Sequence, residues 1–176
     1  MTTVADIIKP RLRILFIGFN PGLRSAETGC HFAGHSNRFW KLLAAAGLTP
    51  RQLRPAESRQ LLEWGCGITN IVARPSKAAA EISKQEYRQG AAVLKAKLTD
   101  YQPAIACYAG IGVYREFSGK KAVACGLQSD SVVPPIDDFV VPSPSGLNRI
   151  AYNEQLYWYL ELKKHAECLC KNTRLV

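Results

Sequence analysis

Short apolar runs alternate along the chain with longer segments in which apolar residues recur at helical spacing. The runs 13–18 and 104–110 are almost wholly apolar and each ends at a glycine, which is typical of a strand buried on both faces. The segment 138–146 begins as a strand and runs into a loop of Pro, Ser and Gly. The run 68–73 is interpreted as a strand or as the entry to a loop.

Helical patterns fill the stretches between these runs. The segment 83–101 places an apolar stripe from Tyr87 to Leu98 on one face, which predicts an amphipathic helix. Gly90 interrupts it and weakens it by about 1 kcal/mol relative to Ala. Ser36 is expected to cap the helix that starts there. Further helices are expected at 36–47, at 56–65, in a short segment ending near 117, and at 151–169.

This alternation predicts an α/β fold, a three-layer α/β/α sandwich around a central, mostly parallel sheet. A length of 176 residues fits one domain, 1–176, and no internal repeat is visible. Ligands of such sheets bind at the carboxyl ends of the strands. Two loops of unusual composition leave predicted strands there, "GFNPGLRSAETGCHF" and "PSPSGLNR".

The first loop holds an asparagine at its bend. Pro21 restricts Asn20 to extended backbone angles, and Pro followed by Gly22 predicts a type II turn with Gly22 in its third position. A pinned carboxamide can donate and accept hydrogen bonds, so it can hold a water molecule. Taken alone, the tetrapeptide "NPGL" is also explained as a plain turn.

The second loop places a leucine beside a glycine at its tip. Leu147 can serve as a wedge in the gap that a base leaves when it is extruded from a duplex. Arg149 next to it can contact a phosphate or a base edge. The alternative is that Leu147 packs under its own loop.

Charge favours a polyanionic partner. The net charge is +9 and the isoelectric point about 9.4, and residues 1–60 carry nine Lys and Arg against three Asp and Glu. No block of like charges forms a tail, so the basic residues are expected to cover a folded surface that suits nucleic acid. A basic protein whose charge serves only its solubility is the alternative.

Several classes of protein lack support in the sequence. No N-terminal cleavage-site pattern and no apolar stretch of transmembrane length are visible, so we expect a cytoplasmic protein without membrane contact. The six cysteines form no C-x-x-C pair, which disfavours a metal site and predicts isolated buried thiols. Neither G-x-G-x-x-G nor G-K-[ST] occurs, which disfavours a nucleotide-binding enzyme.

Five motifs together resemble the mismatch-specific uracil-DNA glycosylase and thymine-DNA glycosylase family, which is family 2 of the uracil-DNA glycosylase superfamily. The similarity runs in order from about residue 10 to the C-terminal helix and implies the uracil-DNA glycosylase fold. The motifs are "GFNPGL" at 18–23, "TGCHFAGHSNRFWK" at 28–41, "GITN" at 67–70, "YQP" at 101–103 and "PSGLNR" at 144–149.

The resemblance implies a role for each matching residue. Asn20 matches the catalytic asparagine that positions the attacking water, and Phe32 matches the aromatic ring that stacks on the flipped base. Main-chain groups of Phe19 and Phe32 are expected to bind the base edge. The implied base pocket comprises Gly18, Phe19, Pro21, Gly22, Ser25, His31, Phe32, Asn70 and Ser143. The implied wedge and backbone contacts are Ser145, Gly146, Leu147, Asn148 and Arg149.

The chain departs from the family pattern at the pocket. Ser143 stands where the bacterial mismatch type has Asn, and His31 resembles the thymine-active branch. Ser25 is bulkier than the alanine of thymine-active enzymes, so uracil is expected to be preferred to thymine. Asn70 occupies a position that varies in the family and tunes substrate choice.

The resemblance therefore implies a monofunctional DNA glycosylase. It is expected to flip out uracil or ethenocytosine opposite guanine in double-stranded DNA, to act as a monomer without metal or cofactor, and to leave an abasic site. One alternative is a related glycosylase for hypoxanthine, for thymine in T·G, or for uracil in any context. Another is a non-catalytic binder of mismatched or abasic DNA.

Overall fold

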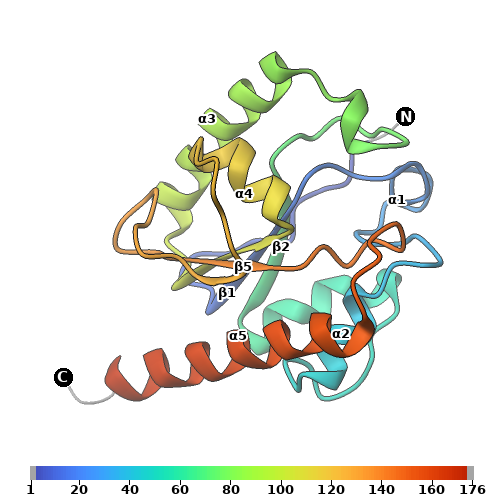
Figure 1. Cartoon of the computed structure of the whole chain (residues 1–176). Helices are drawn as coiled ribbons and strands as arrows, with labels where there is room; N and C mark the ends of the chain where they lie inside the picture. Colours follow the sequence, from blue (N-terminus) through green and yellow to red (C-terminus); the bar gives the residue numbers. More distant parts are fainter. Residues whose placement is uncertain (1–2, 174–176) are drawn as a thin grey trace.

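A five-stranded sheet lies between two layers of helices in the computed structural model, which describes residues 3–173 (Figure 1). The strand order is β2-β1-β3-β5-β4, and all neighbours are parallel except β4 and β5. The predicted three-layer sandwich with a mostly parallel sheet is confirmed. The strands are β1 (Ile14–Gly18), β2 (Cys66–Asn70), β3 (Ile105–Ala109), β4 (Gly126–Leu127) and β5 (Asp137–Val141).

The helical elements follow the predicted alternation with two additions. The short helix α1 and the 3₁₀ turn η2 were not expected, and the segment predicted as a helix at 56–65 is the 3₁₀ helix η1. The bounds are α1 (Leu23–Thr28), α2 (Phe39–Ala45), η1 (Pro55–Trp64), η2 (Ala79–Glu81), α3 (Lys84–Tyr101), α4 (Ile111–Ser118) and α5 (Tyr152–Thr173).

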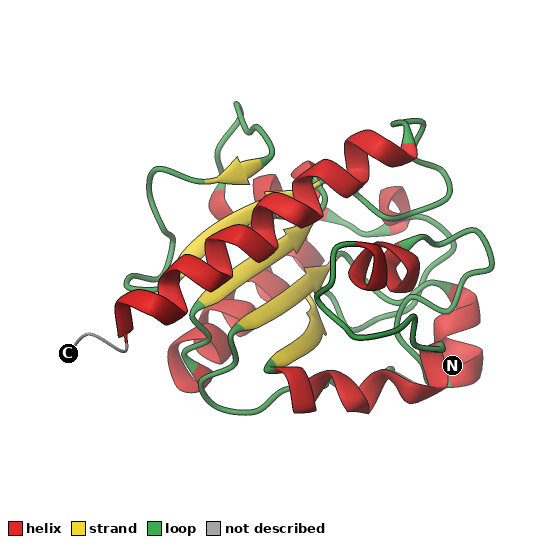
Figure 2. Cartoon of the chain, turned by 90° about the horizontal axis from the view of Figure 1, so that it is seen from below, coloured by secondary structure: helices red, strands yellow, loops and turns green. Residues whose placement is uncertain are grey.

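Both faces of the sheet are covered, which explains why the central strands β1 and β3 are buried along their whole length. In β1, Ile14 and Phe16 pack into the core under α2 and α5, while Leu15 and Ile17 pack into the core under α3 and α4. Seen from below, the long helix α5 lies over one face of the sheet, roughly along the direction of its strands (Figure 2). Side chains therefore alternate between two cores, as the pleat of a strand requires.

Helix α3 matches its prediction and has a defined start. The Ser83 hydroxyl accepts from the Glu86 amide at 3.2 Å, and the Glu86 carboxylate accepts from the Ser83 amide at 2.9 Å, which forms a capping box. Gly90 has a structural reason, because a Cβ there would lie 2.0 Å from the Ile71 carbonyl oxygen. The glycine that weakens the helix lets it pack directly against the chain that follows β2.

Helix α2 starts later than predicted. It begins at Phe39, whose amide donates to Asn37 Oδ1 at 2.9 Å, so the expected cap at Ser36 is wrong. An asparagine can accept from the amide two residues on, and this local bond sets the start of the helix.

The surface also corrects one expectation about the thiols. Cys66 and Cys107 are buried, but Cys168 and Cys170 are exposed on α5.

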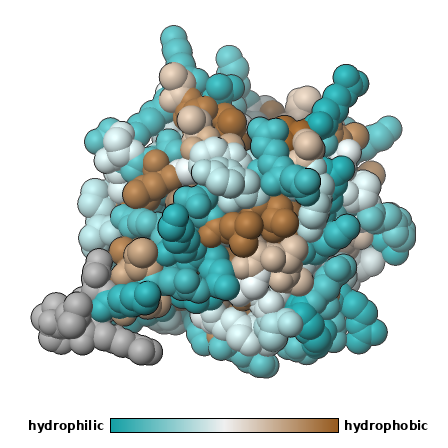
Figure 3. Space-filling model, turned by 60° about the horizontal axis from the view of Figure 1, so that its bottom comes forward, coloured by the Kyte–Doolittle hydropathy of each residue, from teal (hydrophilic) through white to brown (hydrophobic). Residues whose placement is uncertain are grey.

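Hydrophilic side chains cover most of the face in Figure 3, with apolar groups between them. Along residues 3–173 we find no helix whose length and hydropathy suit a membrane span.

Candidate active site

A cavity of about 470 Å³ opens at the carboxyl ends of the parallel strands. Asn20 follows β1, Asn70 ends β2, Ala109 ends β3 and Ser143 follows β5, and all four line the cavity. The chain passes from β1 to β2 on one side and then returns to β3 on the other, so the cavity lies at a switch in strand order. This is where open α/β sheets bind ligands.

The structure brings most of the predicted site residues together around this cavity. All ten residues expected for catalysis and the base pocket line it, and so do Ser145, Leu147 and Asn148. Gly146 and Arg149 lie outside the lining. The sequence interpretation missed Gly34, Asn37, Ser76, Lys77, Ala78, Ala79, Ala109 and Pro144.

The backbone at 18–22 differs from the predicted type II turn. Gly22 is extended, with φ −69° and ψ 164°, whereas the third position of that turn needs a positive φ. Segment 71–76 runs beside 18–22 and extends the pairing of β1 with β2 beyond the sheet. Amides of this segment donate to the carbonyls of Gly18, Phe19 and Pro21 at 2.9, 2.9 and 3.1 Å.

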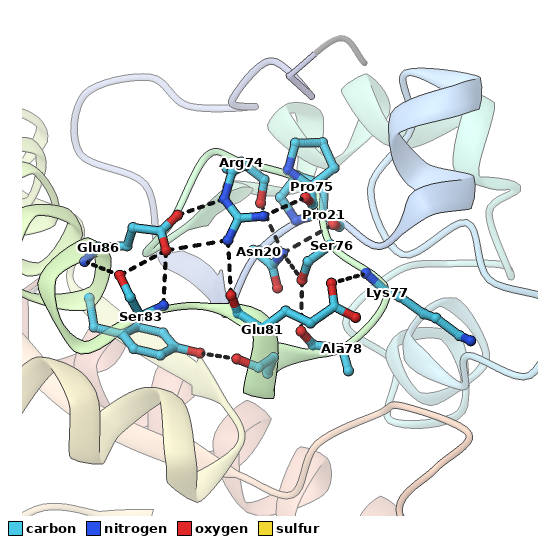
Figure 4. A network of polar contacts seen from close by, with 12 residues as sticks. Asn20, Pro21, Arg74, Pro75, Ser76, Lys77, Ala78, Glu81, Ser83 and Glu86 are labelled. Carbon is cyan, nitrogen blue, oxygen red and sulfur yellow. Dashed lines mark hydrogen bonds and ion pairs between the residues drawn. The ribbon is translucent and has the colours of Figure 1, made fainter.

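The Asn20 side chain is held by its amide nitrogen (Figure 4). Nδ2 donates to the Arg74 carbonyl at 2.9 Å, to Ser76 Oγ at 2.8 Å and more weakly to the Pro21 carbonyl at 3.3 Å. The Ser76 hydroxyl donates its proton to the Ala78 carbonyl at 2.8 Å, so Ser76 Oγ acts as an acceptor toward Asn20. These acceptors fix which end of the carboxamide is nitrogen, and Oδ1 has no hydrogen-bond partner among the described residues.

Phe32 lines the same cavity as Asn20 and has a strained backbone conformation. Its φ is 51°, a region that costs a bulky residue about 1–3 kcal/mol and that is enriched at ligand sites. Its ring stacks on Phe39 at 4.0 Å between centroids, with 23° between the planes. A Cβ at Gly18 would lie 3.6 Å from Phe32 Cζ and 2.6 Å from Asn70 Oδ1, so a glycine leaves the floor of the cavity open.

Phe19 contributes its backbone rather than its ring. The ring packs against Tyr87 of α3 at 6.0 Å, and a Cβ at Gly112 of α4 would lie 2.6 Å from it. The side chain therefore belongs to the core under α3 and α4, while the main chain borders the cavity.

The buried residues His31 and Ser25 of the pocket are both neutral. His31 is 3% exposed, and its Nε2 lies 2.9 Å from the Ala5 carbonyl, so Nε2 carries a proton and donates. Burial lowers the pKa of His31 below 6.5, which keeps the imidazole uncharged at neutral pH. Ser25 Oγ accepts from the Ala33 amide at 3.2 Å.

Leu147 projects from the rim of the cavity. Its side chain is 85% exposed, so the alternative that it packs under its own loop is wrong. The base of that loop is fixed, because the Ser143 carbonyl accepts from Asn148 Nδ2 and Gln155 Nε2, both at 2.8 Å. A Cβ at Gly146 would lie 2.1 Å from Ser36 Oγ, which explains the glycine beside Leu147.

The cavity contains no acid among its described lining residues. Lys77 and the neutral His31 are the titratable groups in that lining, and neither Asp nor Glu is present. Within residues 3–173, no three His, Cys, Asp or Glu side chains come together in a group that could hold a metal ion. A reaction here depends on positioned dipoles rather than on a carboxylate base.

Four of the eight missed lining residues come from one loop. Ser76 to Ala79 follow β2, which neighbours β1, so its carboxyl end faces the same cavity. The loop "ARPSKAAAE" has no periodic pattern of apolar residues and contains none of the five motifs. The rule that ligands bind beyond the carboxyl ends of strands applies to this loop as it does to 18–22.

Comparison with known proteins identifies the family of the chain. A family model described as the uracil DNA glycosylase superfamily matches residues 5–164. The solution NMR structure of a candidate uracil DNA glycosylase from Methanosarcina acetivorans is similar, with a TM-score of 0.60 and 16% identity over 94% of this chain and 98% of that one. At that identity the likeness concerns the fold.

The chain belongs to the uracil DNA glycosylase superfamily. Members of this superfamily are DNA glycosylases, hydrolases that act on DNA in base-excision repair.

Proposed function

We propose that the protein is a monofunctional, mismatch-specific DNA glycosylase. It flips uracil, or a related base such as ethenocytosine, out of double-stranded DNA where the base is paired with guanine, and it leaves an abasic site. The orientation of the Asn20 carboxamide supports this most directly. Its nitrogen is bound by protein acceptors, its oxygen has no hydrogen-bond partner among the described residues, and Asn20 and Phe32 line the same cavity.

The chemistry follows from the groups at the cavity. Asn20 Oδ1 accepts a hydrogen bond from a water molecule and aims the oxygen of that water at C1′ of the extruded nucleotide. The C1′–N1 bond breaks, and its electron pair leaves with the base as an anion, while the water forms the new C1′–O bond and releases its proton to solvent. Amide donors of Phe19 and Phe32 at the base edge stabilise the departing anion.

The absence of a carboxylate in the described lining limits which bases can leave. A carboxamide cannot take a proton from water as a general base, and the neutral His31 is a poor proton donor to the leaving base. Bases that are stable as anions, such as uracil, are therefore the favoured substrates. Ser25, buried in the pocket wall, is the residue expected to disfavour the 5-methyl group of thymine.

Mispairing provides the remaining selectivity. Extruding a base costs a few kcal/mol of pairing and stacking, and this cost is lowest at a mismatch. Leu147, exposed at the rim, is suited to fill the space that the base leaves in the stack.

Base release from four duplexes tests the proposal. Purified protein is incubated with U·G, U·A, T·G and ethenocytosine·G duplexes, and alkali converts abasic sites into strand breaks. We expect U·G to be processed fastest and T·G slowest, with the strand intact until alkali is added. Tight binding to mismatched DNA with no base released from any duplex would instead identify a non-catalytic binder.

Asn20→Ala tests the assigned role. We expect its single-turnover rate of uracil release to fall by about 10²-fold or more, because a misplaced reactant costs about that much, with duplex affinity retained. Asn153→Ala, an exposed asparagine of α5, is the matched control. Wild-type cleavage by Asn20→Ala would show that Asn20 does not position the water.

A further inference from the structure

Two of the three acceptors that orient Asn20 belong to one short segment after β2. The Arg74 carbonyl and Ser76 Oγ stand 54 and 56 residues from Asn20 in the sequence. The direction of the carboxamide therefore depends on where this segment is placed, and the local turn at 18–22 does not determine it.

The segment is fixed by a side chain that points away from the cavity. The Arg74 guanidinium extends toward the start of α3 (Figure 4). Its Nε donates to Glu86 Oε1 at 2.6 Å, and Nη2 donates to Glu86 Oε2 at 3.3 Å and to the Glu81 carbonyl at 3.1 Å. Two parallel bonds between guanidinium and carboxylate fix direction as well as distance.

Glu86 is in turn tied to the helix end. The same carboxylate accepts from the Ser83 amide and hydroxyl, both at 2.9 Å, in the capping box of α3. Arg74 and this cap lower the pKa of Glu86 to about 2, so the pair is ionised at any pH at which DNA repair operates.

Helix α3 touches the segment a second time, one turn further along. Gly90 follows Glu86 by four residues and lies on the same helix face. A Cβ at Gly90 would lie 2.0 Å from the Ile71 carbonyl oxygen, so the helix backbone packs directly on the segment there. Helix α3 thus contacts the segment at two points, Ile71 and Arg74.

We propose that Arg74 and Glu86 are positioning residues through which the first turn of α3 sets the orientation of the Asn20 carboxamide. This inference rests on the proposed function of Asn20. Neither side chain touches the cavity, and their effect on base release passes through the Arg74 peptide and Ser76.

Glu86→Gln separates this positioning role from a role of Glu86 in capping the helix and from a role of Arg74 in binding a DNA phosphate. Glutamine can keep the capping box, so the variant removes the ionic fork while the helix start remains. Arg74 is 49% exposed, and a direct contact of its charge with a DNA phosphate is the competing explanation. In that case Glu86→Gln frees the Arg74 guanidinium to contact DNA, so duplex affinity increases while the rate of base release is unchanged.

Side-chain NMR tests the orientation without reference to activity. The Asn20 carboxamide cross-peak is assigned by its absence from Asn20→Asp. In Glu86→Gln we expect its two protons to exchange with solvent about tenfold faster, as the loss of a charge-assisted contact allows. Exchange at the wild-type rate would overturn the inference.

Kinetics give the second readout. We expect Glu86→Gln to lower single-turnover release from a U·G duplex about tenfold at unchanged duplex affinity. The variant Arg74→Lys keeps the positive charge but should release uracil as slowly as Glu86→Gln, because lysine cannot form the fork. Release by Glu86→Gln within twofold of wild type would also overturn the inference. Wild-type protein that releases no base, combined with faster exchange in Glu86→Gln, would reject the proposed function and support the positioning role.

Glu57→Gln is a matched control. Glu57 also accepts in a capping box, pairs with an exposed arginine, Arg51, at 3.1 Å, and has a pKa of about 2 through these contacts. It lies at η1, away from the segment after β2. We expect this variant to leave the Asn20 exchange rate and base release unchanged, and an equal effect of both variants would contradict a specific role for Glu86.

Discussion

The loop at 18–22 and the loop at 143–149 both follow parallel strands, yet they present their functional side chains in opposite ways. Asn20 is half-buried and bonded through one nitrogen to three acceptors. Leu147 is 85% exposed and holds an apolar side chain in solvent. The first loop is ordered before any ligand binds, and preorganised dipoles suit a chemical step. The second keeps apolar area uncovered, which is an advantage only when a partner buries it.

The loops differ less at their bases than at their tips. The second loop is anchored by Gln155, which is fully buried and bonded to both the Ser143 carbonyl and Arg38 Nη1 at 2.8 Å. Its backbone is also tied to α2, because the Arg38 amide donates to the Pro144 carbonyl at 2.8 Å. A wedge must keep its place while its tip stays free, and this anchoring provides that.

Removal of an acceptor that holds Asn20 of the first loop has the largest expected effect on this comparison. Ser76→Ala leaves an Asn20 donor with one acceptor fewer, and losing a partner for a buried polar group costs about 1–3 kcal/mol. Single-turnover base release should fall about 5- to 100-fold at unchanged duplex affinity. Thr28→Ala, which removes a hydroxyl bonded to the Arg24 carbonyl of α1, serves as control and should keep the wild-type rate.

Truncation of the exposed side chain of the second loop comes next. Leu147→Ala removes apolar area that the duplex would bury, worth about 1.5–3 kcal/mol for a whole leucine. Release from duplex U·G should fall about tenfold, while release from single-stranded uracil DNA should stay as in wild type. Leu160→Ala on α5, which is also exposed, controls for surface truncation. Equal losses on both substrates would mean that Leu147 contributes to the pocket and not to the duplex gap.

The neutral histidine under the first loop predicts a pH dependence of stability. Burial lowers the folded-state pKa of His31, so the unfolded chain takes up the proton first as pH falls. Its contribution should lower the free energy of unfolding as pH drops below about 6.5 and be absent above that value. Urea titrations of wild type and His31→Gln at about pH 8 and pH 5.5 measure this. The variant should lose less stability over that interval, and an equal loss would contradict a buried neutral imidazole.

The smallest expected effect concerns the glycine in the first loop. Gly22 has a negative φ, and a Cβ added to it would meet no atom within 4 Å, so alanine fits the conformation. As the residue before α1, Ala is a slightly poorer cap than Gly, at a cost of about 1 kcal/mol or less. Base release by Gly22→Ala should stay within twofold of wild type. A large loss would favour the type II turn that the sequence predicted.

Much of the architecture was predictable from the chain alone. The runs at β1 and β3 are apolar throughout because both faces of the sheet are covered. Helix α3 carries its start in Ser83 and Glu86 and its buried stripe from Tyr87 to Leu98. These signals are local, because they rest on neighbours within one or two turns of chain.

Other elements could not be predicted from the sequence, and the reasons are also physical. Helix α1 has six residues and no apolar period, so "LRSAET" resembled a loop. The turn at Gly22 was misjudged because pairing with the segment after β2 draws the backbone into an extended form, which overrides the preference of Pro followed by Gly. Proline and glycine preferences describe isolated turns, and a neighbouring strand changes them.

The sequence by itself determined that Asn20 stands at the end of a buried strand, restricted by Pro21, and that Leu147 lies in a second loop beyond another strand. Only the tertiary structure decided which way the carboxamide faces and that the leucine is uncovered. Backbone preferences act over a few residues, whereas hydrogen-bond direction and exposure depend on groups that lie more than 50 residues away and meet only when the sheet forms.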